Sequence, residues 1–86
     1  MRLVFTESAW ADYQWFQDRD RKLVKRINTL IKEVLRSPYE GIGKPESLKA
    51  NLSGYWSRRI NEEHRLVYAV KDTDEVIVAC RYHYGE

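Results

Sequence analysis

The 86-residue sequence predicts a small α+β domain in which two helices pack on one face of a twisted, mainly antiparallel sheet. Three observations predict this class. An apolar stripe with helical spacing runs through residues 20–36, and alternating apolar residues recur from residue 54 to residue 82. Between them, turn-forming residues gather in one connection. A chain of this length has room for one hydrophobic core, so we expect a single domain covering residues 1–86.

The chain opens with a predicted strand followed by a helix. Residues 3–5 are a short apolar run bounded by Thr6, which we interpret as a strand. Thr6 and Ser8 offer capping hydroxyls, and Glu7 suits the positive end of a helix dipole. Aromatic residues then recur at about helical spacing, at Trp10, Tyr13 and Phe16. We therefore expect a first helix that ends at about Gln17.

The clearest periodic signal follows. Asp20 is a good N-cap, and Ser37-Pro38 ends the pattern. The apolar positions between them form one continuous stripe: Leu23, Val24, Ile27, Leu30, Ile31, Val34 and Leu35. We interpret this stripe as the face that packs against the sheet, and the basic residues around it as a solvated face.

A long connection and three strands complete the chain. Residues 38–53 are rich in glycine, proline and asparagine, and Leu48 with Leu52 indicates a short helical turn there. A loop this long in a small domain is often functional. We expect strands at Gly54–Ile60, His64–Lys71 and Glu75–Tyr82, which gives the order β-α-α-β-β-β.

The first of the two predicted hairpins has two different faces. A turn at residues 61–63 sets Ile60 opposite His64 and therefore Arg59 opposite Arg65. One face is apolar and carries Trp56, Ile60, Leu66, Tyr68 and Val70. On the other face two guanidinium groups lie side by side, and like charges directly opposite each other are destabilising. Such a pair is most easily explained if an anion binds between the two arginines.

The second predicted hairpin extends both faces. With a turn at residues 72–74 and Lys71 opposite Glu75, the core face gains the pairs Leu66–Cys80, Tyr68–Val78 and Val70–Val76. The face without helices then carries Arg59, Arg65, Arg81 and His83 at one end, with Val67, Ala69, Ile77 and Ala79 further along. A single exposed arginine usually has no role beyond solvation. Three arginines and a histidine in one cluster favour a site for a phosphate group, because the guanidinium fork suits phosphate.

Composition limits the kind of site. The net charge of +2 fits an anionic partner without demanding one. A single cysteine allows no intrachain disulfide, which is typical of a cytoplasmic protein. No run is long and apolar enough for a membrane span, so we expect no membrane partner. One cysteine and two histidines make a structural zinc site improbable, and we expect neither a metal nor a cofactor. Cys80 and His64 fall on the core face and are interpreted as structural.

The remaining candidates suit cleavage of an RNA phosphodiester without a metal. The ribose 2′-hydroxyl attacks the adjacent phosphorus, which requires a base, an acid for the leaving 5′-oxygen and positive charge for the phosphorane. We assign Glu46, which lies between Lys44 and Lys49 on the long connection, as the base, and His83 as the acid. Arg65 would be the main stabiliser of the phosphorane. Arg59, Arg81 and Lys49 would hold phosphates, and Tyr55 and Tyr84 could stack on a base.

The stretch GKPESLKANLSGYWSRRINEEHRLVYAV, followed by VIVACRYHY, closely resembles the Txe/YoeB family of toxins within the RelE superfamily. The resemblance covers residues 3–84. It implies the RelE-like form of the fold described above and endoribonucleolytic cleavage of mRNA in the ribosomal A site. It also implies that the protein inhibits translation and that a cognate YefM/Axe-like antitoxin neutralises it. The catalytic positions of the family match Glu46, Arg65 and His83, and its supporting positions match Lys49, Arg59 and Tyr84. Toxins of this family are often dimeric, which adds a second copy of the chain as a candidate partner.

Two other functions fit the arginine-rich face. The first is a non-catalytic module that binds RNA or a peptide there. The second is a ParE-like toxin that acts on DNA gyrase, although such a toxin would not need acid–base residues at this place.

Overall fold

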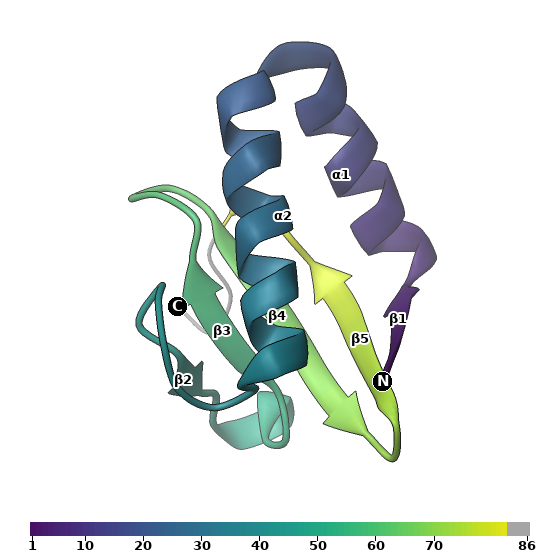
Figure 1. Cartoon of the computed structure of the whole chain (residues 1–86), viewed down its shortest axis with the longest axis vertical. Coiled ribbons are helices and arrows are strands. Elements are labelled where there is room, and N and C mark those ends of the chain that lie inside the picture. The colour runs from purple at the N-terminus through teal and green to yellow at the C-terminus, as the bar shows by residue number, and fades with distance from the viewer. Residues whose placement is uncertain (83–86) are drawn as a thin grey trace.

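The computed structural model describes residues 1–82, which form two α-helices packed on a five-stranded sheet (Figure 1). In chain order the elements are β1 (Arg2–Phe5), α1 (Glu7–Arg19), α2 (Arg21–Arg36), β2 (Glu46–Ser47), the short 3-10 helix η1 (Ala50–Leu52), β3 (Trp56–Arg59), β4 (Arg65–Lys71) and β5 (Asp74–Ala79). The strand order is β1-β5-β4-β3-β2. Only β1 pairs in parallel, with β5; the other three pairings are antiparallel. The predicted α+β class and the position of the helices are confirmed.

The two helices begin where capping residues were expected. The Thr6 hydroxyl accepts the Ala9 N–H at 3.1 Å, and the Asp20 carboxylate accepts the Leu23 N–H at 3.1 Å. Each bond satisfies a backbone donor that the first turn leaves without a helical partner. The first helix runs two residues past the predicted Gln17, to Arg19, and the second ends at Arg36 as predicted.

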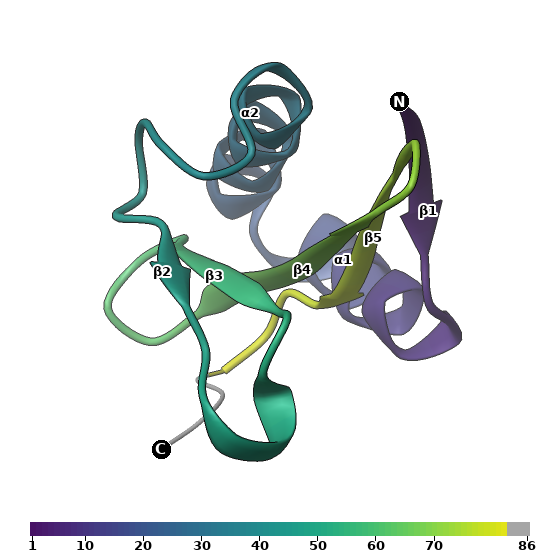
Figure 2. The same cartoon turned by 90° about the horizontal axis from the view of Figure 1, so that it is seen from below.

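The core lies between the helices and the sheet. Its buried members are Ala9, Phe16, Ile27, Leu30, Ile31, Val34, Ile60, Leu66, Tyr68, Ile77 and Cys80. The stripe on α2 supplies four of them, which confirms its predicted role. Figure 2 shows α2 on one side of the sheet and the segment after β2, with η1, on the other side. The later part of the long connection, after β2, therefore lies on the side opposite α2.

The register of β3 with β4 is as predicted. Trp56 pairs with Tyr68, and Arg59 pairs with Arg65. The turn between these strands is organised by Asn61, whose side-chain oxygen accepts the N–H groups of Glu63 and His64. This bonding of an asparagine to the backbone two and three residues on is typical of tight turns.

The predicted register of β4 with β5 is wrong at four of the five paired positions. The turn is one residue shorter than expected, so Lys71 pairs with Asp74 in place of Glu75, and Tyr68 pairs with Ile77. Asp72 adopts a φ of +53°, a conformation that aspartate tolerates better than most residues, and this allows the tighter turn. An irregularity between Val67 and Tyr68 restores the predicted register, in which Val67 faces Ala79.

These shifts change which residues are buried. Ile77, expected on the face without helices, lies in the core, and Glu75 is buried as well. Val70, Val76 and Val78, expected in the core, are only partly buried. The face opposite the helices is also less open than expected, because Val67, Ala69 and Ala79 on it are buried. Arg59 is exposed at one end of this face, and Lys71 is exposed at the other.

Candidate active site

The arginine pair is the centre of the candidate site. Arg59 lies directly opposite Arg65. The backbone N–H of Arg59 donates to the Gly43 carbonyl at 2.6 Å, and that of Arg65 donates to the Tyr82 carbonyl at 3.0 Å. The backbone N–H groups of Arg59 and Arg65 therefore do not bond to each other's residue. In the next pair along the hairpin, the Ile60 N–H donates to the His64 carbonyl. Facing residues of an antiparallel sheet that are not hydrogen-bonded to each other have Cα atoms about 4.5 Å apart, and their side chains are closer than in hydrogen-bonded pairs.

Arg65 is held by the turn that precedes it. Its Nη1 donates to the carbonyls of Asn61 at 2.5 Å and His64 at 3.1 Å. A guanidinium has five N–H donors, and those on Nε and Nη2 have no hydrogen-bond partner among residues 1–82. In the described part of the chain neither Arg65 nor Arg59 forms an ion pair with a carboxylate. The site thus presents an anchored and uncompensated cation beside an exposed one.

Glu46 lies on the same face as this pair. The unexpected strand β2 pairs Glu46 with Ser57, and Ser57 pairs in turn with Val67. Side chains on paired residues share a face, and so do alternate residues along one strand. Glu46 and Arg59 therefore face the same side, displaced by two residues, or about 7 Å along the strand direction. Lys49 precedes η1 and lines a shallow hollow with Glu46, and both side chains are exposed.

The loop before β2 is held close to the sheet by a glycine. Gly43 has a φ of +84°, and a Cβ atom there would lie 2.9 Å from Leu30 Cδ2 and 3.1 Å from Arg58 Cβ. Only glycine allows this close approach together with that backbone conformation. Its carbonyl then accepts the Arg59 N–H, which ties the loop to β3 three residues before Glu46.

Arg58 is a second anchor of this loop, and sequence reasoning missed it. Its side chain is completely buried and donates to the carbonyls of Ser37, Glu40 and Ile42 and to the Tyr68 hydroxyl. The signal was present in the alternation of β3, because Arg58 lies between the core residues Trp56 and Ile60 with the same parity. A charge at a core position is retained when it is fully hydrogen-bonded.

Arg81 was predicted to lie on the open face of the last strand, but it lies outside that strand. Strand β5 ends at Ala79, and the Arg81 guanidinium lies 3.8 Å from the centre of the Trp15 ring on α1 and 4.7 Å from that of Tyr82. It also donates to the Tyr82 hydroxyl at 2.8 Å. Stacking between two rings stabilises the cation but leaves fewer of its donors exposed. A phosphate-holding role for Arg81 stays a prediction.

Four further predicted residues belong to the candidate site or its surroundings. His83 and Tyr84, predicted as the acid and a supporting aromatic residue, lie outside the described residues. Tyr55 is partly buried, with the Lys71 ammonium 5.9 Å from its ring centre. His64 is buried on the core side, edge to face with Phe16, as predicted for a structural histidine.

Three buried groups, those of Tyr68, Glu75 and Cys80, have pKa values that burial raises. Burial raises the pKa of the Cys80 thiol to about 12, with a smaller contribution from the Asp12 carboxylate. This thiol is therefore protonated and poorly nucleophilic at neutral pH, as expected for a core residue. Burial also raises the pKa of Glu75 to about 7, against an opposing effect of Arg58. Neither carboxylate oxygen of Glu75 has a hydrogen-bond partner within the described chain.

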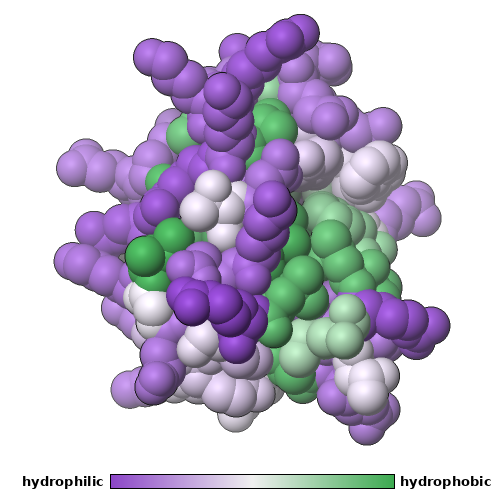
Figure 3. Space-filling view, in the orientation of Figure 1, coloured by the Kyte–Doolittle hydropathy of each residue, from purple (hydrophilic) through white to green (hydrophobic). Residues whose placement is uncertain are grey.

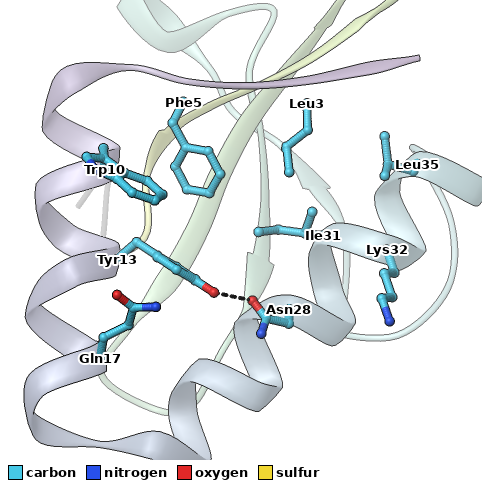
Figure 4. A pocket seen from close by; sticks show the side chains of 9 residues that line it. All are labelled: Leu3, Phe5, Trp10, Tyr13, Gln17, Asn28, Ile31, Lys32 and Leu35. Carbon is cyan, nitrogen blue, oxygen red and sulfur yellow. Dashed lines mark hydrogen bonds between the residues drawn. The ribbon is translucent and has the colours of Figure 1, made fainter.

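A separate apolar groove lies on the helix side. Figure 3 shows a hydrophobic surface between α2 and β1, and Figure 4 shows the side chains that line the groove there. They are Leu3, Phe5, Trp10, Tyr13, Gln17, Asn28, Ile31, Lys32 and Leu35. The Tyr13 hydroxyl donates to Asn28 Oδ1 at 2.7 Å and links the two helices across it. One lysine among nine lining residues gives the groove little acid–base chemistry, so the arginine face is the better candidate.

Residues 1–82 contain neither a cluster of metal-ligand side chains nor a membrane-spanning helix. No three histidine, cysteine, aspartate or glutamate side chains in this range come together as metal ligands could. No helix in this range has the length and apolar character needed to cross a membrane.

The chain matches known proteins over nearly its full length. Residues 5–84 match the family model of the YoeB-like toxin of bacterial type II toxin–antitoxin systems. The Toxin YoeB of Synechocystis sp. is 66% identical over 84 residues, covering 98% of both chains. Two solved Staphylococcus aureus structures, a YoeB dimer and a heterotetrameric YoeB–YefM toxin–antitoxin complex, are each 54% identical, with TM-scores of 0.91 and 0.90 and 98% coverage of both chains. Together with the fold and the arginine face, these matches show that the chain belongs to the family of YoeB-like toxins of bacterial type II toxin–antitoxin systems.

Proposed function

We propose that this toxin is an endoribonuclease that cleaves mRNA in the ribosomal A site, in the cytoplasm, and so inhibits translation. The observation that carries the proposal is the arginine pair. Arg59 and Arg65 lie side by side on the face that also bears Glu46, and within residues 1–82 no carboxylate pairs with either. An uncompensated pair of cations costs stability, and a phosphodiester between them removes that cost.

The reaction is transesterification by the substrate's own ribose. The 2′-oxygen forms a bond to the adjacent phosphorus as its proton passes to a base. The bond from phosphorus to the 5′-oxygen breaks as that oxygen receives a proton from an acid. The products are a 2′,3′-cyclic phosphate and a free 5′-hydroxyl. DNA lacks the 2′-hydroxyl, so the protein should cleave RNA only.

Each proposed group has a distinct task. Glu46 takes the 2′-proton and His83 protonates the leaving oxygen, each contributing roughly 10²–10⁴-fold. Arg65 stabilises the phosphorane through the N–H groups that its turn contacts leave available. A fixed donor of this kind contributes about 3–4 kcal/mol to lowering the barrier. Arg59, Lys49 and Arg81 hold flanking phosphates, and Tyr84 supports the base or phosphate next to them.

The partners follow from the family. The Staphylococcus aureus relative has been solved both as a dimer and in complex with YefM. We propose that a YefM-like antitoxin neutralises this chain and that the free toxin also forms a homodimer.

The decisive experiment uses ribosomes programmed with a defined mRNA. Purified toxin is added, the mRNA 5′ ends are mapped, and the same RNA without ribosomes serves as the control. We expect ribosome-dependent cleavage at the A site that disappears in Arg65→Ala and His83→Ala, while both variants still bind ribosomes.

The alternatives give different outcomes. A folded wild-type protein that binds ribosomes without cleaving mRNA would contradict the proposal and favour the non-catalytic module. Inhibition of DNA supercoiling by gyrase, with mRNA intact, would favour the ParE-like function.

A further inference from the structure

His64 contacts the backbone immediately before the segment that carries His83. Its ring is buried, and Nδ1 accepts the Tyr82 N–H at 2.8 Å. A ring nitrogen that accepts a hydrogen bond carries no proton, so the neutral ring carries its proton on Nε2. Nε2 lies 3.4 Å from Glu63 Oε1. The described contacts therefore select one tautomer of this histidine.

Tyr82 is also held through its carbonyl, by the residue that follows His64. The Tyr82 carbonyl accepts the Arg65 N–H at 3.0 Å. Consecutive residues, His64 and Arg65, thus bind both the N–H and the carbonyl of Tyr82. These two bonds fix the backbone of Tyr82 relative to β4, the strand that carries Arg65.

Tyr82 needs such support. Its φ is +64°, which is unfavourable for a bulky side chain and persists only where surrounding contacts enforce it. The His64 ring packs against the Tyr82 ring, with centroids 5.5 Å apart, and edge to face against Phe16 at 5.0 Å. The acceptor nitrogen is thus fixed by core packing and is not free to turn away.

The His64 backbone also supports the arginine. Its carbonyl accepts from Arg65 Nη1 at 3.1 Å and from the Ile60 N–H at 3.0 Å. One residue therefore contacts the proposed phosphorane stabiliser through its carbonyl and the segment leading to the proposed acid through its ring.

We propose that His64 is a positioning residue, whose unprotonated Nδ1 fixes the backbone at Tyr82 beside Arg65, the point from which the chain continues to the proposed acid. This inference rests on the proposed ribonuclease function. Displacing a reacting group by about 1 Å can cost roughly 10²-fold in rate, so loss of this bond should lower kcat far more than it raises KM.

The test uses two amides that replace different ring nitrogens. In His64→Asn the amide oxygen can occupy the place of Nδ1, whereas in His64→Gln it reaches the place of Nε2. His64→Phe keeps a ring and removes both nitrogens. Tyr13→Phe, which removes the exposed Tyr13–Asn28 bond on the helix side, is the control for the loss of an unrelated side-chain hydrogen bond.

We expect His64→Asn and Tyr13→Phe to stay within about threefold of the wild-type kcat on programmed ribosomes. We expect His64→Gln and His64→Phe to fall about 30–100-fold, with KM changed less than about threefold. Equal activity in all three His64 variants, or equal loss in all three, would overturn the inference.

A measurement on the wild type separates this inference from the ribonuclease proposal. Nitrogen NMR of the folded toxin should show the Nε2–H tautomer at His64, and the Tyr82 amide should be protected from hydrogen exchange. Exchange at Tyr82 should become faster in His64→Gln than in His64→Asn. If the wild type does not cleave mRNA, the ribonuclease proposal fails whatever these spectra show. A charged or Nδ1-protonated ring, or an unprotected Tyr82 amide, overturns the role of His64 even if the enzyme is active.

Discussion

Arg58 and Arg59 are neighbours in the chain and have opposite situations. Arg58 faces the helices, is completely buried, and donates to three carbonyls and the Tyr68 hydroxyl. Arg59 faces the other side of the sheet, is exposed, and stands opposite Arg65 without a carboxylate among the described residues. The alternation of a strand separates them onto two faces, and each face uses the guanidinium differently.

The difference shows how to separate structural from functional arginines. Arg58 has its donors satisfied by the loop at residues 37–42, so it can offer little to a ligand. Arg59 and Arg65 have donors left over and a repulsion that a phosphate would relieve. Substitutions on the first face should change the stability of the fold, and those on the second should change activity.

The largest effect is expected at Arg58. Arg58→Met should lower the free energy of unfolding by about 3–5 kcal/mol, because it removes the donor from three loop carbonyls at once. Urea unfolding measures the loss. Arg59→Met, one residue away, is the matched control and should change stability by no more than about 1 kcal/mol, the size of the repulsion from Arg65. Equal midpoints for the two variants would show that the carbonyl contacts of Arg58 contribute little.

Arg65 should show the opposite pattern. Arg65→Ala should lower kcat for ribosomal mRNA cleavage about 10²–10³-fold, the usual cost of removing one fixed donor to a transition state. Single-turnover kinetics on programmed ribosomes measures it. Arg65→Lys keeps the charge without the fork, so an intermediate rate is expected. Wild-type kcat in Arg65→Ala would remove Arg65 from the chemistry.

The buried face should also respond to pH through Glu75. Its pKa is raised from its ordinary value of 4.5 to about 7, because burial penalises the charged form. The protonated Glu75 carboxyl contributes to the free energy of unfolding. This contribution is fully present below pH 4.5 and is lost as the pH rises through about 7. At about 1.4 kcal/mol per pKa unit, the folded protein should lose about 3 kcal/mol across this window.

Glu75→Gln isolates this contribution. Unfolding free energies of both proteins are measured from pH 5 to pH 8.5, and the difference between the two curves removes the titration of other groups. The variant should gain stability relative to the wild type as the pH rises. Parallel curves would show that the Glu75 carboxylate does not titrate differently in the folded and unfolded states.

Much of the fold was predictable because local signals agreed with the tertiary structure. Thr6 and Asp20 cap the helices as their side chains suggest. The apolar stripe on α2 can be buried only if that face of the helix packs against the sheet. The register of β3 with β4 follows from alternation and from the turn at Asn61. This register brought Arg59 opposite Arg65, which is the part of the site that sequence reasoning located correctly.

The missed features depend on contacts between distant segments. Strand β2 has only two residues and no apolar pattern, so pairing with β3 alone defines it. The register of β5 depended on a turn one residue shorter than Asp72-Thr73-Asp74 suggested, and this error hid the burial of Glu75. Arg58 needs three carbonyls from a loop whose path no local pattern specifies.

The smallest effect is expected at Arg59, and it has two parts of opposite sign. Arg59→Ala should raise KM for programmed ribosomes about tenfold, because one phosphate contact is lost, and it should weaken the salt dependence of binding. The same change should raise the free energy of unfolding of the unbound toxin by roughly 0.2–1 kcal/mol at low salt, because the repulsion from Arg65 disappears. Lys25→Ala removes one exposed positive charge from α2 and is the control for net charge. Both parts should shrink as salt is added, since the charges involved are partly exposed. If Arg59→Ala destabilises the toxin more than Lys25→Ala does, then the two arginines do not repel each other, and the main argument for a phosphate between them is lost.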